Sequence, residues 1–428
     1  MSKPILVRSA AELLETILTG KLPADAQMEK YFRAHPQMGV RDRGFVAETV
    51  YGCLRAKRVL AHIAGTEDPA ALVAAQLLTE GYSARALEQA GFRGDARAAA
   101  ERARTLDRGT LPFAVRANLP DWLAEKLLAQ FGETEATALA TALNQPAPVD
   151  LRVNTLKAKR EEVQARLASE DLPAELTPHS PAGLRRRSRT PLFRTECFKE
   201  GLFEVQDEGS QLLSYLVEPK RHEMVVDFCA GAGGKTLHLG ALMANTGTLY
   251  AFDVSAKRLE RLKPRLKRAG LNNVRTVAIR HERDERVQRL HGKIDRVLVD
   301  APCSGTGTLR RNPDIKWRAM DLAELVAAQK NILAAAAALV KPGGRLVYAT
   351  CSLLHEENEA IVEDFLARHP EFSPVPAVEI LARRHIAIPP PHPSPARGEG
   401  ESEDKALRLF PNRHGTDGFY ACAFARAA

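Results

Sequence analysis

Two cysteines in this sequence stand in short motifs where a reactive thiol would be useful. Cys303 lies in DAPCSGTG and Cys351 lies in YATCSLLHEEN. Each motif follows an apolar run typical of a buried strand, so two strands of one sheet would open both thiols into the same cleft. A thiolate is a strong nucleophile. Isolated cysteines are otherwise common as small buried apolar residues, which is our interpretation of Cys53, Cys197 and Cys422.

A glycine-rich turn after another apolar run indicates that the backbone approaches a ligand closely. The turn is CAGAGGKT, residues 229–236. A phosphate-binding P-loop would need glycine where Cys229 stands, and a dinucleotide-binding turn would need glycine where Thr236 stands. S-adenosylmethionine needs neither. Its methionine end can lie over the turn while Asp253, at the end of the next expected strand, accepts from the ribose hydroxyls.

Spacing alone leaves a nicotinamide dinucleotide open as an alternative. Asp253 lies 22 residues after Gly231, which a dinucleotide-binding fold would also place well. An oxidoreductase, however, would give the two cysteines no role, so we expect S-adenosylmethionine. The residues expected to hold it are Cys229, Ala230, Gly231, Ala232, Gly233, Gly234, Lys235, Asp253 and Asp300.

The elements that must position these residues fall into three parts. Residues 1–110 carry apolar residues at helical spacing, with glycines at the expected helix ends, and predict a helical domain. Residues 111–215 hold clustered prolines and short mixed segments, which we interpret as a small α+β accessory subdomain. Residues 216–428 alternate strand and helix. This alternation predicts an α/β domain with a parallel, doubly wound sheet and helices on both faces.

Local signals refine the last part. The segment after Asp253 predicts a helix that begins after the N-cap Ser255 and stops at Gly270. Residues 417–424, DGFYACAF, predict a closing strand. Residues 388–403 are rich in Pro, Gly, Ser and Glu, and we expect a disordered surface loop there.

Composition excludes several classes of protein. The chain has 428 residues and a formal charge of +8, which favours a polyanionic partner without establishing one. Its six cysteines include no CxxC pair, so we expect neither a disulfide framework nor a bound metal. It has no uncharged apolar run of about 18 residues and no secretory signal pattern, so we expect a cytoplasmic protein without a membrane span.

These motifs together resemble the RsmB/Sun-type RNA cytosine-5 methyltransferases. The resemblance covers most of residues 111–428, and its most specific part is the pair DAPCS and TCS in this order. It also includes FEVQDEGSQLL, DFCAGAGGKT, DAPCSGTGTLRRNPDIKW, KPGGRLVYATCS and DGFYAC. Residues 38–55 are more weakly similar to the NusB-like helical RNA-binding domain that is fused to some members. The resemblance implies a Rossmann-like class I methyltransferase sheet.

The resemblance also implies roles for individual residues. Cys351 is the thiolate that adds to carbon 6 of cytosine, and Cys303 assists the breakdown of the adduct. From the chemistry that these roles require, we further predict that Asp300 faces the edge of the base and that Lys235 is a candidate to favour the thiolate form of Cys351. We expect an RNA partner, ribosomal RNA in particular, and a monomer. Transfer RNA as the substrate and a non-catalytic RNA-binding assembly factor stay open as alternatives.

Two further groups of residues concern the expected contacts to adenine and to phosphate. The position that aligns with an adenine-binding acid in the family reads His281, with Glu282 beside it. Arg310, Arg311, Lys316 and Arg318 stand beside the Cys303 motif, and we expect them to contact phosphate, whereas we expect Trp317 to pack. The arginines at 185–189 and the basic helix at 255–269 are interpreted as solvated surface or as further phosphate contacts.

Overall fold

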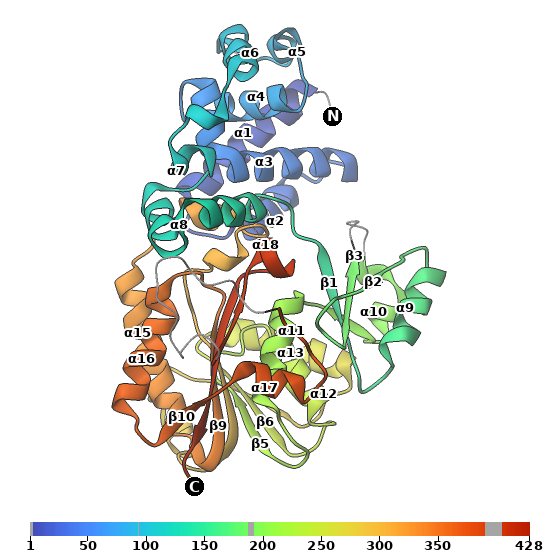
Figure 1. The fold of residues 1–428 in the computed structure, drawn as a ribbon. Helices are drawn as coiled ribbons and strands as arrows, with labels where there is room; N and C mark the ends of the chain where they lie inside the picture. The colour runs from blue at the N-terminus through green and yellow to red at the C-terminus, as the bar shows by residue number, and fades with distance from the viewer. Residues whose placement is uncertain (1–2, 93, 187–191, 390–404) are drawn as a thin grey trace. The chain divides into compact units, whose positions relative to one another are not determined.

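The computed structural model describes residues 3–92, 94–186, 192–389 and 405–428, which form two compact units (Figure 1). The first unit contains Met1–Pro146 and Thr308–Met320, and the second begins at Ala147 and contains the remaining described segments. The small accessory region therefore groups with the large sheet by compactness, and our division into three domains stays a prediction. Residues 390–403 of the expected disordered loop lie outside the described residues.

The first unit is helical, as the spacing of its apolar residues predicted. The glycine at 65 adopts a left-handed conformation (φ 75°) and ends α3. Buried aliphatic side chains from α1, α3, α4 and α6 form one core. Its elements are α1 (Lys3–Thr19), α2 (Ala24–Ala34), α3 (Val40–Ala64), α4 (Pro69–Thr79), α5 (Ala84–Gln89), α6 (Ala96–Thr105), η1 (Arg108–Thr110), α7 (Phe113–Arg116), α8 (Asp121–Leu143) and η4 (Pro313–Trp317).

A kink in α3 changes the hydrogen bonding of that helix. Ala56 is non-helical (φ −112°, ψ 16°). The N–H of Val59 donates to Oδ1 of Asn118 at 3.1 Å. The carbonyl of Arg55 accepts from Nζ of Lys316 at 2.9 Å. The kink thus creates backbone partners for the distant segment that contains Lys316.

The second unit contains the large sheet, whose order is β10-β12-β9-β8-β5-β6-β7, with β11 paired to β12. Strands β5 to β9 run parallel to one another, whereas β12 is antiparallel to β9, β10 and β11. The sheet is therefore mainly parallel, with an antiparallel edge. Its strands are β5 (Met224–Asp227), β6 (Thr248–Asp253), β7 (Val274–Ala278), β8 (Ile294–Asp300), β9 (Val340–Thr350), β10 (Phe372–Val375), β11 (Ala406–Leu409) and β12 (Phe419–Arg426).

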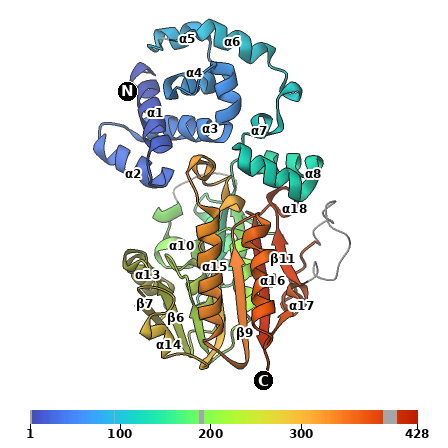
Figure 2. The ribbon, with the colours of Figure 1, turned by 90° about the vertical axis from the view of Figure 1, so that its left-hand side faces the viewer.

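Helices cover both faces of this sheet. Val297 and Val299 of β8 face one core with α15 and α16, while Leu298 faces the other core with α11, α12 and α17. Figure 2 shows α15 and α16 side by side along one face. The helices of this layer structure are α11 (Glu208–Val217), α12 (Gly234–Leu242), α13 (Ala256–Ala269), α14 (Glu285–Gln288), α15 (Leu322–Ala337), α16 (Glu359–Arg368), α17 (Ala377–Ala382) and α18 (Pro411–His414), with the short turns η3 (Thr306–Thr308) and η5 (His355–Glu357).

The signals predicted for α13 are confirmed. The Ser255 side chain accepts from the N–H of Arg258, and Gly270 adopts a left-handed conformation that ends the helix. The predicted closing strand is β12, which begins at Phe419.

A small antiparallel sheet, order β2-β3-β1-β4, also belongs to the second unit. Its elements are β1 (Val149–Val153), α9 (Arg160–Ser169), β2 (Glu175–Leu176), β3 (Gly183–Arg186), η2 (Leu192–Arg194), α10 (Glu196–Lys199) and β4 (Phe203–Val205). Glu204 of β4 forms ion pairs with Arg265 and Arg268 of α13. Asn154 donates to the carbonyl of Ala269 at 2.9 Å. These bonds fix the small sheet to the last turns of α13.

Candidate active site

The two cysteines singled out in the sequence lie together. The Sγ atoms of Cys303 and Cys351 are 3.4 Å apart. The two residues follow the carboxyl ends of the adjacent parallel strands β8 and β9, and both are half-buried. Cys53, Cys197 and Cys422 are buried, as expected for packing residues. The thiols of Cys303 and Cys351 are therefore accessible and close enough to act on one ligand.

The surroundings of Cys303 favour its neutral, protonated form. The hydrogen bond between the two thiols, followed by burial, raises the pKa of the Cys303 thiol well above its ordinary value. Cys303 is therefore held as a neutral thiol in this arrangement. Backbone bonds also join the two loops, because the N–H of Gly307 donates to the carbonyl of Cys351 at 2.8 Å.

An ion pair links two other predicted site residues. Nζ of Lys235 lies 2.6 Å from Oδ2 of Asp300, and the Lys235 side chain is only 11% exposed. Burial alone would lower the pKa of Lys235, but the charge of Asp300 and the hydrogen bond to it outweigh burial and raise it. Lys235 is therefore a fixed positive charge at the carboxyl ends of β5 and β8. Its influence on Cys351 stays a prediction.

The glycine turn leaves space for a ligand at Gly231 but not at Gly233. Gly231 has φ +57°, and a Cβ atom there would meet no other atom within 4 Å. A Cβ atom at Gly233 (φ +87°) would come within 2.1 Å of Cδ1 of Leu262 in α13. Gly231 therefore borders open space, whereas Gly233 is needed for close packing of the turn on a helix.

Asp253 lies against this turn. Its Oδ2 accepts from the N–H of Gly231 at 2.8 Å, and its Oδ1 accepts from the N–H of Ser255 at 2.7 Å. A buried arginine supports the turn from the small sheet, because Arg152 donates to the carbonyl of Gly234 at 2.6 Å. The Asp253 carboxylate, the open backbone at Gly231 and the Lys235–Asp300 ion pair thus lie at the carboxyl ends of neighbouring strands. This arrangement fits a ligand with a ribose and a charged amino-acid end. Cys229, Ala230 and Ala232 occupy the same turn, with Cys229 packed against the core.

Asp227 is a site neighbour that we did not single out from the sequence. It ends β5, is 1% exposed, and its Oδ2 accepts from Oγ1 of Thr236 at 2.6 Å. Its Oδ1 has no hydrogen-bond partner among the described residues. Burial raises the pKa of Asp227 to about 7. The local sequence Asp227-Phe228-Cys229 does not by itself indicate that the Asp227 carboxylate is buried.

The loop after β7 contains the two residues expected near the adenine. His281 is exposed and Glu282 is half-buried. The buried acid in this loop is Asp284, which accepts from the N–H of Arg280 at 2.9 Å and from the guanidinium of Arg286 at 2.8 Å. Asp284 is therefore occupied in closing the loop.

The expected phosphate contact at Lys316 is wrong. Lys316 is 2% exposed, and its ammonium donates to the carbonyls of Arg55 and Asn118 and to Oδ1 of Asn144 at 2.9–3.0 Å. Arg310 is also buried, at 6% exposed. Trp317 packs, as expected, and its indole donates to the carbonyl of Leu54 at 2.8 Å. This segment is an anchor within the helical unit.

Both interpretations of Arg185 and Arg186 are also wrong. They lie in β3, where Arg185 donates to the buried carboxylate of Asp150 at 2.7 and 2.9 Å. Arg186 is 3% exposed and donates to the carbonyl of Pro173 at 3.0 Å. The other three arginine-loop positions, 187–189, lie outside the described residues.

The basic helix α13 divides into two classes of side chain. Arg265 and Arg268 are structural, because both pair with Glu204. Lys257, Arg261 and Lys267 are exposed. Arg258 and Lys263 are also exposed but pair with Asp253 and Glu260, so Lys257, Arg261 and Lys267 are the exposed cations of α13 most available to a polyanion.

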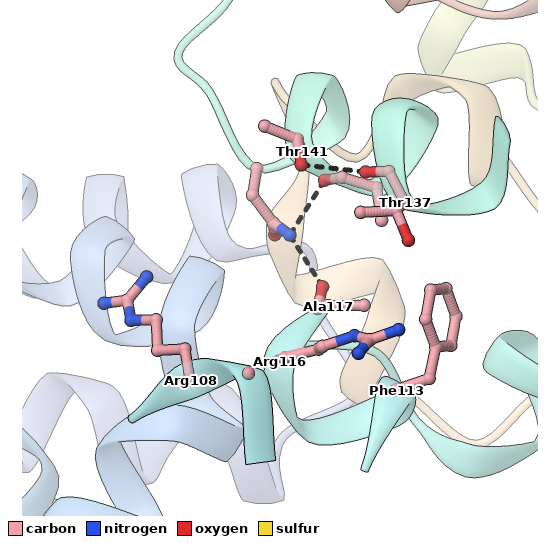
Figure 3. Close-up of a pocket in the computed structure, with 9 residues that line it drawn as sticks. Arg108, Phe113, Arg116, Ala117, Thr137 and Thr141 are labelled. Carbon is pink, nitrogen blue, oxygen red and sulfur yellow. Dashed lines mark hydrogen bonds between the residues drawn. The ribbon is translucent and has the colours of Figure 1, made fainter. Parts of the chain in front are cut away.

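The helical unit has a hollow of about 400 Å³ between α7 and α8 (Figure 3). Asn144 forms one wall and donates to the carbonyls of Ala117 and Ala140 at 2.7 and 2.9 Å. Arg116 lies 5.5 Å from the centre of the Phe113 ring and pairs with Glu133. The lining holds two guanidinium groups but no thiol, carboxylate or imidazole, so we place no chemical step there.

The described ranges lack two kinds of feature. No cluster of three or more His, Cys, Asp or Glu side chains there is arranged to hold a metal ion. Of the helices in the same ranges, none combines the length and apolar character that crossing a membrane requires.

Comparison with known proteins gives two family matches. Residues 214–425 match the family described as 16S rRNA methyltransferase RsmB/F. Residues 119–192 match the ferredoxin-like domain of RsmF/B-like methyltransferases. The methyltransferase match contains both cysteines, the glycine turn, Asp253 and Asp300, and so covers every catalytic and cofactor-binding residue predicted from the sequence.

Individual relatives agree with these matches. Proteins named "Probable ribosomal RNA small subunit methyltransferase B" are 38% identical in Synechocystis, over 63% of this chain and 61% of the relative, and 31% identical in Bacillus subtilis, over 73% and 68%. The chain thus spans about three fifths to two thirds of these relatives. The solved structure of a "Methyltransferase Homolog Protein" from Pyrococcus horikoshii is 30% identical with a TM-score of 0.64, over 75% of this chain and all of that one.

Proposed function

This chain belongs to the RsmB/F family of 16S ribosomal RNA methyltransferases, and we propose that it methylates carbon 5 of a cytosine in ribosomal RNA. The observation that most supports the reaction type is the 3.4 Å separation of Cys303 and Cys351 beside the Lys235–Asp300 ion pair. Two accessible thiols in contact suit a reaction in which one forms a covalent bond and the other acts on the same ring.

Carbon 5 of cytosine is a poor nucleophile until the ring is activated. In our proposal the thiolate of Cys351 forms a bond to carbon 6, and the displaced π electrons make carbon 5 electron-rich. S-adenosylmethionine, when bound, supplies the methyl group to carbon 5 as a sulfonium electrophile. The carbon 5 proton then leaves to a base, the S–C6 bond breaks, and the ring double bond re-forms with the Cys351 thiolate released.

The neutral thiol of Cys303 suits the second role. Its raised pKa keeps a proton available next to the sulfur that must leave. Cys303 thus assists the breakdown of the adduct. In our proposal Asp300, which Lys235 holds, accepts from the exocyclic amine of the base and so selects cytosine.

The turn at residues 229–235 and Asp253 would hold S-adenosylmethionine. Open space next to Gly231 and the Asp253 carboxylate support this assignment. The names of the relatives support ribosomal RNA as the substrate. A cytosine inside a duplex is unreachable, so the target base must be unpaired or extruded.

Trapping the adduct tests the proposal. Purified protein is incubated with tritiated S-adenosylmethionine and small-subunit ribosomal RNA, and methylated positions are mapped by bisulfite sequencing. We expect tritium in 5-methylcytosine, a denaturant-resistant RNA adduct in Cys303→Ala, and neither product nor adduct in Cys351→Ala. Turnover by Cys351→Ala, or a crosslink at another residue, would refute the mechanism. Labelling of transfer RNA alone would refute the substrate assignment.

A further inference from the structure

A buried carboxylate lies between the two cysteine loops. Glu357, the last residue of η5, is fully buried. Its Oε1 accepts from the N–H of Ser304 at 2.8 Å and from Nε2 of Gln329 at 2.9 Å. Its Oε2 accepts from Oγ of Ser304 at 2.5 Å and from Oγ of Ser352. Four donors therefore converge on one side chain.

The donors flank the two thiols in the chain. Ser304 directly follows Cys303, and Ser352 directly follows Cys351. Gln329 also donates from Nε2 to the carbonyl of Pro302 at 2.9 Å. The backbone of the Cys303 loop is thus held on both sides of the cysteine. One carboxylate binds the residue after each sulfur-bearing position.

A second set of bonds reinforces this contact. Oγ of Ser304 lies 3.1 Å from Oγ of Ser352, and Oγ1 of Thr306 accepts from the N–H of Leu353 at 2.9 Å. The position of Glu357 is itself fixed, because the hydroxyl of Tyr348 donates to the Glu357 carbonyl at 2.7 Å. The backbone of Glu357 is therefore held by the strand β9 that leads into Cys351.

Burying a carboxylate is costly unless donors compensate for the lost water. Three of the four donors to Glu357 come from the two cysteine loops, and the fourth, Gln329, is bonded to one of them. An apolar side chain would fill the same space without joining the loops. The use of a carboxylate here thus points to alignment of the two loops.

We propose that Glu357 is a positioning residue that sets the separation of the Cys303 and Cys351 sulfur atoms by holding Ser304 and Ser352 on one carboxylate. Its catalytic meaning rests on the function proposed above. Its role in setting the distance between the two sulfur atoms does not rest on that function, because this distance can be tested without RNA.

Oxidation by an azo compound such as diamide measures that separation. The two S–H bonds break, one S–S bond forms, and the two electrons and two protons reduce the N=N bond of the oxidant to a hydrazine. The rate is followed by mass spectrometry of the peptide pair linked through Cys303 and Cys351. Methyl transfer to RNA and affinity for S-adenosylmethionine are measured on the same variants.

Four variants distinguish positioning from simple folding. Glu357→Ala removes all four contacts, and Glu357→Asp withdraws the carboxylate by one methylene. Glu357→Gln keeps one acceptor oxygen, and its amide can donate to the two rotatable hydroxyls. Glu363→Ala, at an exposed position on α16, is the matched control.

We expect the disulfide to form about tenfold more slowly in Glu357→Ala and Glu357→Asp, with kcat lowered about 100-fold, because a misplacement of about 1 Å costs this much in rate. KM for RNA and affinity for S-adenosylmethionine should stay near the wild-type values. Glu357→Gln should restore most of both rates, and Glu363→Ala should match wild type.

Disulfide formation at the wild-type rate in folded Glu357→Ala or Glu357→Asp would overturn the proposal. If the alanine variant does not fold, the aspartate variant decides in the same way. A folded Glu357→Gln with both rates as low as those of Glu357→Asp would also overturn it, because positioning through hydrogen bonds should survive that change. Should wild type form the disulfide but methylate no RNA, the proposed function fails while the positioning role stands.

Discussion

The ammonium of Lys235 lies 2.6 Å from the carboxylate of Asp300, and this pair joins the glycine turn after β5 to the end of β8. The Asp300 side chain is 30% exposed, so it can still reach a ligand while Lys235 holds it in place. The pair connects the turn proposed for the cofactor with the loop that begins the DAPC motif.

Replacing Lys235 by methionine should therefore lower the rate of methyl transfer about 100-fold, because a fixed charged donor at a reacting site is worth about that much. The single-turnover rate at saturating RNA is the measurement. Lys263→Met is the control, since Lys263 pairs with Glu260 on the exposed face of α13. A Lys235→Met rate close to that of the control would contradict a role for the ion pair.

The buried Asp227 predicts an unusual pH dependence of stability. Burial raises its pKa to about 7 in the folded protein, whereas the unfolded value is about 3.9. The folded state therefore binds the proton more tightly, and stability falls as pH rises from about 4 to about 7, by at most about 1.4 kcal/mol per pH unit.

Asp227→Asn should remove this dependence, because an amide does not ionise. The free energy of unfolding of the variant, relative to wild type, should rise between pH 5 and pH 7.5, as measured by urea denaturation across that range. The hydroxyl of Thr236 can still donate to the asparagine carbonyl. Parallel pH profiles of the two proteins would show that Asp227 does not titrate in this window.

Lys316 supplies a test between an anchor and a phosphate contact. In Lys316→Met the acceptors on Arg55, Asn118 and Asn144 lose their donor. Each orphaned buried acceptor costs about 1–3 kcal/mol, so we expect Tm to fall by at least about 4 °C. Lys267→Met, at an exposed position of α13, should leave Tm unchanged. Loss of RNA affinity with an unchanged Tm in Lys316→Met would restore the phosphate interpretation.

Two glycines of the turn should respond differently to alanine. Gly231→Ala places a methyl group in open space beside the turn, so affinity for S-adenosylmethionine should fall, with a loss of stability of about 1 kcal/mol from the left-handed conformation. Gly233→Ala forces Leu262 to move and should mainly lower Tm. Calorimetric titration and thermal unfolding of both variants separate the two effects. Equal losses of affinity and Tm in the two variants would contradict the assignment.

Much of the site was visible in the sequence because parallel strands place their carboxyl ends at one edge. The apolar runs before Asp253, Asp300 and Cys351 predicted that these residues meet there, and the structure places them at the ends of β6, β8 and β9. Local signals such as Ser255 and Gly270 fixed the ends of α13 for the same reason, since a cap depends on residues close in the chain.

Residues buried by distant partners were not visible in this way. Lys316 is buried by groups at positions 55, 118 and 144, and a lysine in a basic run ordinarily stays in water. Glu357 stands in the acidic run HEENE and is buried by donors from two loops and a helix. The one available signal for Glu357 was the serine that follows each of the two cysteines.

The path of the chain has a consequence for how this protein can be shortened. It leaves the second unit after Gly307, contributes Thr308–Met320 to the first unit, and returns at Asp321. The helical part is therefore not a detachable module at the front of an enzyme. Deletion of residues 1–146 would remove the helices that cover Lys316 and Trp317, and would expose an apolar, partly charged segment that begins at Thr308, five residues after Cys303.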